Sequence, residues 1–113
     1  MKLKTGALAA FSLAVLAGCS SSAPKCSDTE TIDLVKEIVL EALTEEVGQF
    51  VAAQFKMELH GIRTTDVNEK TGAQECAAQI ELSGPNGTVK EDITYTSEKT
   101  DKGDEFYVTV YGL

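Results

Sequence analysis

The stretch CAAQIELSGPNGTVKEDITYTSEK, residues 76–99, decides the fold. Its first part alternates apolar and polar residues, which is typical of a strand with one face in a core. The apolar members are Cys76, Ala78, Ile80 and Leu82. A tight turn is expected at residues 84–87, GPNG, because Asn and Gly accept the positive φ angles of such turns. Alternation resumes over residues 88–99 with Ile93 and Tyr95 inward, so the stretch predicts an antiparallel hairpin.

Two further strands are expected, one on each side of this hairpin. Downstream, a turn at residues 101–104 precedes a strand that alternates inward and outward residues up to Leu113. Its inward set is Phe106, Val108 and Val110, and its outward set is Tyr107, Thr109 and Tyr111. Upstream, a strand from residue 56 carries Met57, Leu59 and Ile62, and its phase slips at Gly61, where a bulge is tolerated. Residues 68–72, NEKTG, turn the chain into the hairpin.

A helix is expected before the strands. Ser27 and Glu30 match a capping box, in which each side chain bonds the other residue's amide. Apolar residues then recur at steps of three and four up to Phe50 and Val51, which predicts a helix to about residue 54 in spite of Gly48. The sequence thus predicts an α+β domain over residues 26–113, with one long N-terminal amphipathic helix packed on a four-stranded antiparallel meander sheet.

The N-terminus has the pattern of a secretory signal. Lys2 and Lys4 precede an apolar run of 11 residues, 6–16, which is shorter than the roughly 20 residues that a membrane-spanning helix needs. The run ends in Leu16-Ala17-Gly18-Cys19, which resembles the lipobox of bacterial lipoproteins. The resemblance implies cleavage after residue 18 and acylation of Cys19. An ordinary signal peptide, with Cys19 incidental, is the alternative.

The resemblance also implies an outer-membrane location facing the periplasm, because Ser20 is not the aspartate that favours retention in the inner membrane. Two or more acyl chains anchor a protein stably. Residues 19–25 are expected to be the lipidated cysteine and a flexible tether, since they contain serines and a proline and no large apolar residue.

The remaining cysteines, Cys26 and Cys76, form an even number outside the reducing cytoplasm, which favours a disulfide between them. A metal pair and a free redox thiol are the alternatives, and neither has CxxC spacing or nearby histidines in support.

We find no arrangement typical of catalysis. His60 is the only histidine and is expected to be exposed on an edge strand, and the DKGDE turn lacks the ligand spacing of a calcium loop. The sequence therefore predicts a protein that is not an enzyme and that needs no metal or cofactor.

Charge restricts the partners. Removal of residues 1–18 takes two of the ten basic residues, leaving 8 against 18 acidic residues and a formal net charge of −10. Such a chain repels nucleic acid and anionic lipid head groups. The charge is compatible with a basic protein partner, whose approach it would accelerate, and solubility alone also accounts for it.

The outward sheet face is the candidate binding surface, with Glu81, Tyr107 and Tyr111 as its contact residues. A solvated face without a partner would look similar. The function expected is that of a non-enzymatic accessory or protein-binding lipoprotein. The alternative is an inhibitor or immunity protein that neutralises a basic enzyme, such as a lysozyme.

Overall fold

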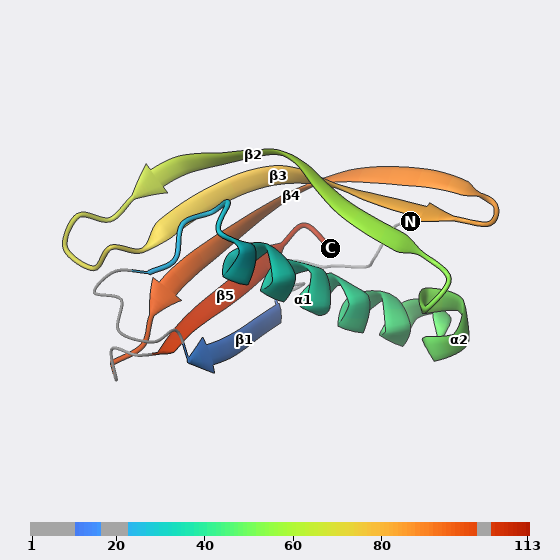
Figure 1. The fold of residues 1–113 in the computed structure, drawn as a ribbon, viewed down its shortest axis with the longest axis horizontal. Coiled ribbons are helices and arrows are strands. Elements are labelled where there is room, and N and C mark those ends of the chain that lie inside the picture. The colour runs from blue at the N-terminus through green and yellow to red at the C-terminus, as the bar shows by residue number, and fades with distance from the viewer. Residues whose placement is uncertain (1–10, 17–22, 102–104) are drawn as a thin grey trace.

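The computed structural model describes residues 11–16, 23–101 and 105–113. One antiparallel sheet of order β1-β5-β4-β3-β2 has α1 lying along one of its faces (Figure 1). In chain order the elements are β1 (Phe11–Leu16), α1 (Thr29–Val47), α2 (Gln49–Ala52), β2 (Lys56–Val67), β3 (Gln74–Gly84), β4 (Gly87–Lys99) and β5 (Glu105–Tyr111). The α+β class and the meander from β2 to β5 are confirmed.

The sheet has one strand more than the sequence predicted. β1 comes from the apolar run of the expected signal segment and pairs antiparallel with β5, from Phe11 opposite Val110 to Leu16 opposite Glu105. An apolar run without alternation carries no strand period, so its pairing with β5 could not be read from the sequence.

The inner faces of the strands and one side of α1 form the core. The predicted inward residues of β3, β4 and β5 are all buried. On α1 the buried apolar residues are Leu34, Val35, Ile38, Val39, Ala42 and Leu43. Their spacing of three and four residues places them on one side of the helix, where α1 packs against the sheet.

Both ends of the predicted helix need correction. The N-cap residue is Asp28 and makes no side-chain capping bond, so the capping box of Ser27 and Glu30 does not form. The Asp28 carboxylate instead accepts a hydrogen bond of 2.9 Å from the Lys25 amide, within the turn that precedes the helix. At the other end α1 stops at Val47, because Gly48 has a φ of 89° and its amide closes the last turn onto Thr44.

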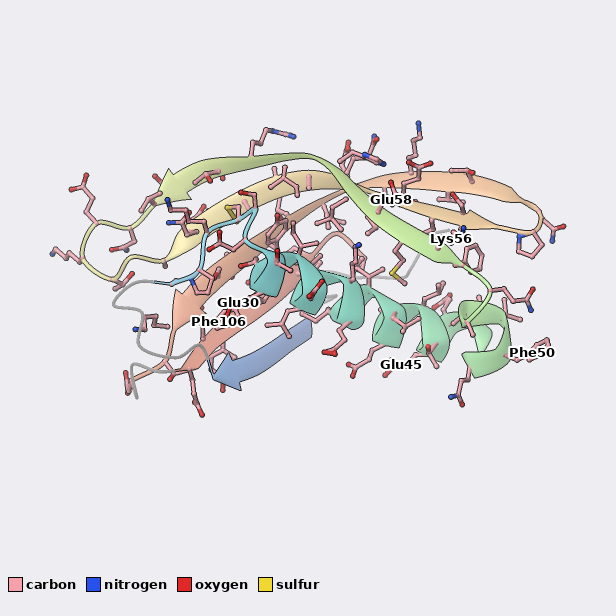
Figure 2. The ribbon with its side chains drawn as sticks, viewed as in Figure 1. Glu30, Glu45, Phe50, Lys56, Glu58 and Phe106 are labelled. Atoms are coloured by element: carbon pink, nitrogen blue, oxygen red, sulfur yellow. A yellow bond between two sulfur atoms is a disulfide. The ribbon has the colours of Figure 1, made fainter. Side chains whose placement is uncertain are left out.

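The chain continues into the short α2 in a new direction, and this exposes residues that the helical period had placed inward. Phe50 is 82% exposed, and Val47 and Val51 are exposed too. Figure 2 shows Phe50 projecting from α2 away from the rest of the molecule. The prediction that the apolar stripe remains buried as far as Val51 is therefore wrong.

The predicted irregularities of the strands are present. The register of β2 against β3 shifts between His60 and Arg63, around Gly61, whose φ of 64° suits a bulge. The hairpin turn brings Gly84 opposite Gly87, and the positive φ there belongs to Gly87, at 135°. Most of the predicted last turn, residues 102–104, lies outside the described residues.

The expected tether is described only in part. Cys19 and residues 20–22 lie outside the described residues, whereas Ala23 and Pro24 are buried. The end of the expected tether is thus packed into the domain.

Candidate functional site

A disulfide joins the segment before α1 to the beginning of β3. Cys26 and Cys76 are bonded with their Cα atoms 5.7 Å apart, and both are buried. The predicted pairing is confirmed, which excludes a metal pair or free thiols at these positions. Beside the bridge, the Tyr95 hydroxyl donates a hydrogen bond of 2.9 Å to the Cys26 carbonyl oxygen. Burial raises the pKa of Tyr95 to about 12, because the phenolate would lose its hydration.

The outer face of the sheet, opposite α1, carries the predicted binding residues. Tyr107 and Tyr111 are 43% and 45% exposed, and they alternate along β5 with the fully buried Phe106, Val108 and Val110. In a strand, alternate side chains point to opposite faces. The tyrosines therefore face away from α1.

Glu81 lies on the same face as the tyrosines but on β3, at different distances from the two. It pairs across to Lys90 on β4, whereas Tyr107 pairs with Glu98, eight residues further along the same strand. At about 3.3 Å per residue this separates the two positions by about 26 Å. Tyr111, opposite Thr94, lies about 13 Å from the Lys90 position by the same measure. Glu81 therefore lies on the predicted face, nearer to Tyr111 than to Tyr107, and a contact surface that includes all three residues stays a prediction. We call the part of this face around Tyr107 and Tyr111 the tyrosine surface.

Glu81 also belongs to a small polar cluster with two residues of β2. His60 Nε2 lies 2.7 Å from Glu81 Oε1 and 3.5 Å from Glu58 Oε1. All three residues are at least partly exposed. Their ligand atoms could gather around a divalent ion, yet the hydrogen bond between His60 and Glu81 explains the arrangement without one.

This cluster was not predicted, because His60 is the only histidine and was expected to stand alone on an edge strand. The spacing of Glu58 and His60 puts both on one face of β2, which the sequence could have indicated. Their meeting with Glu81 depends on the register of β2 against β3, in which Glu58 faces Glu81 across the strands. No local pattern determines that register.

A hollow of about 360 Å³ adjoins the tyrosine-bearing part of the sheet. Tyr111 forms one side of it, and Thr65, Thr94, Thr96 and Glu75 contribute polar atoms. Hydroxyl groups and one carboxylate suit hydrogen bonding with a polar or basic side chain of a partner. The hollow thus places threonine hydroxyl groups and one carboxylate next to Tyr111.

A second surface feature is apolar and lies at the opposite end of α1. A hollow of about 390 Å³ lies between the α2 region and the β3–β4 hairpin, lined in part by Val51, Phe55 and Pro85. Gly84 lies beneath the Phe55 ring: a Cβ there would come within 2.6 Å of Phe55 Cε1. A Cβ at this position would therefore displace the Phe55 ring.

No family model, no curated protein and no solved structure matches this chain. Among the described residues, no helix is both long and apolar enough to cross a membrane.

Proposed function

We propose that this protein is a small acidic lipoprotein, anchored by Cys19 in the bacterial outer membrane and facing the periplasm, with a non-enzymatic accessory role in which it binds a basic protein. The anchor is supported by the cationic start, the apolar run and the LAGC motif at residues 16–19. The binding role is supported by the outer sheet face and by the net charge of −10 that remains after removal of residues 1–18.

The observation that carries the binding role is the exposure of Tyr107 and Tyr111. Each side chain is more than two fifths exposed, whereas the core side of the same strand is formed by the buried residues between and beside them. Aromatic side chains are enriched where proteins meet, because they bury a large area at a small cost in conformational entropy. The position of Tyr111 at the hollow that Glu75 and three threonines also line fits a partner that offers both apolar and basic groups.

Labelled palmitate tests the anchor. Cells expressing the full chain should incorporate the label, the Cys19→Ala variant should not, and the matched Ser21→Ala variant should be labelled normally. Ser20→Asp should shift the labelled protein from the outer to the inner membrane fraction. Incorporation of label into the Cys19→Ala variant would show that the lipid anchor is placed wrongly.

Cross-linked capture from solubilised envelopes tests the binding role. The Tyr107→Ala/Tyr111→Ala variant should lose a partner that the wild-type protein retains, since truncation of an aromatic anchor costs about 2 kcal/mol or more. Phe50→Ala removes an exposed aromatic side chain elsewhere and should retain the partner. Equal capture by all three proteins would remove the tyrosine surface from consideration.

Inhibition of a purified basic enzyme distinguishes the alternative role. If the lipoprotein inhibits a lysozyme at equimolar amounts, and the double tyrosine variant does not, the accessory role is replaced by that of an inhibitor.

A further inference from the structure

The outer edge of β5 is occupied by a segment that the proposed processing removes. Residues 11–16 pair with β5 over six register positions, and they lie at the end of the sheet beside β5 (Figure 1). Cleavage after residue 18 would take this whole strand away. The inference that follows therefore rests on the proposed lipoprotein processing.

Loss of β1 changes β5 from an inner strand to an edge strand. Its backbone N–H and C=O groups that face β1 would lose their partners, and unpaired edge groups are a template for another strand. Three residues on the inner side of β5, Phe106, Val108 and Val110, are fully buried while β1 is in place. β1 also contacts α1, so its removal exposes the parts of α1 and β5 that it contacts.

We infer that the β5 edge of the mature protein is a docking site for an extended apolar segment of another protein, which adds to the sheet antiparallel to β5. The chemistry of the occupant follows from the segment seated there, FSLAVL, in which Ser12 is the only polar residue. Strand addition of this kind takes its affinity from main-chain hydrogen bonds and its selectivity from alternate side chains.

A second copy of this chain is the other occupant to consider, through pairing of two β5 edges. Charge disfavours it, because each mature chain carries a net charge of −10 and two such domains would repel each other. β5 also begins with Glu105 and has no basic residue of its own to offset this repulsion. A partner strand without that acidic domain, or from a basic protein, avoids the cost.

Peptide binding to the mature lipoprotein tests the inference. The protein is purified from membranes in detergent, and its intact mass shows whether residues 1–18 are absent and Cys19 is acylated. The probe is a synthetic peptide of the FSLAVL sequence followed by two lysines. Two further peptides carry backbone N-methyl groups, one at the positions of Phe11, Leu13 and Val15 and the other at the alternate positions. Affinity is measured by titration, and hydrogen exchange is followed at the amides of β5.

The unmodified peptide should slow exchange at alternate β5 amides in the cleaved protein. A strand presents the N–H groups of alternate residues to each of its edges. One methylated peptide should therefore bind at least about tenfold more weakly, and the other should bind like the unmodified peptide. The Cys19→Ala precursor keeps residues 11–16 and is the matched control, which should not bind.

Other results would overturn the inference. Equal affinity of the two methylated peptides would mean nonspecific apolar binding, and absence of binding to the cleaved protein would mean that no strand site exists. Protection of the β5 edge without peptide, in a species of twice the monomer mass, would assign the edge to a second copy. An intact mass that retains residues 1–18 would refute the lipoprotein proposal and this inference together, whereas the peptide results on cleaved protein test the strand site alone.

Discussion

Loss of the Cys26–Cys76 disulfide is expected to lower the melting temperature of this protein by about 15 °C or more. The bridge joins positions 50 residues apart, and closing a loop of that length removes chain entropy from the unfolded state worth about 4 kcal/mol. For a domain of this size each kcal/mol corresponds to about 4–8 °C. Both sulfurs are buried, so alanine at these positions adds a small packing cost of about 1 kcal/mol.

Thermal unfolding followed by circular dichroism measures the effect. The Cys26→Ala/Cys76→Ala variant is compared with the wild-type protein, oxidised and after reduction with dithiothreitol. Reduced wild-type protein isolates the cross-link from the packing cost, because its side chains are unchanged. The Ser21→Ala variant, which keeps the bridge and the lipidated cysteine, should melt like the oxidised protein.

Two results would refute this reasoning. A melting temperature within about 5 °C of the wild type in the double variant would mean that the unfolded state gains little freedom when the bridge is absent. Alkylation of both thiols in the untreated mature protein would mean that the bridge does not form in the cell envelope.

Three further predictions concern single side chains. The pKa of Tyr95 is raised from 10.0 to about 12, so between these pH values the folded state keeps a proton that the unfolded state loses. The free energy of unfolding should therefore fall by up to about 3 kcal/mol as the pH rises from 10 to 12. Urea unfolding at several pH values should show this fall, and the Tyr95→Phe variant should show a smaller one. Gly84→Ala should lower the free energy of unfolding by about 1–3 kcal/mol, because the new Cβ displaces the Phe55 ring. Adding Phe55→Leu to the same chain should recover part of this loss. If the losses of the two single variants simply add in the double variant, Gly84 and Phe55 do not interact as the structure shows. Phe50→Ala should change stability by less than about 0.5 kcal/mol, while Phe106→Ala, at 0% exposure, should cost about 3–5 kcal/mol; similar costs for both would mean that α2 packs differently.

The sequence alone determined most of the sheet. Alternation over residues 76–99 and in β5 identified the buried side chains, because a strand with one face in a core must repeat every two residues. The disulfide was also predicted, since the lipobox resemblance assigns Cys19 to lipid and so leaves Cys26 and Cys76 with a single possible pairing. The outward direction of Tyr107 and Tyr111 followed from the same alternation.

Only the tertiary structure decided the features that depend on competition between segments. The helical period continues past Gly48, but the backbone turns there at a positive φ, which glycine permits without requiring it, so Phe50 is exposed. The cluster of His60 with Glu81 depends on a strand register that passes through a bulge. The pairing of residues 11–16 with β5 depends on an edge formed almost a hundred residues later in the chain. The local pattern of apolar residues indicates which side of a helix or strand is buried. Which distant segment packs or pairs with that side depends on the surfaces that the whole folded chain brings together.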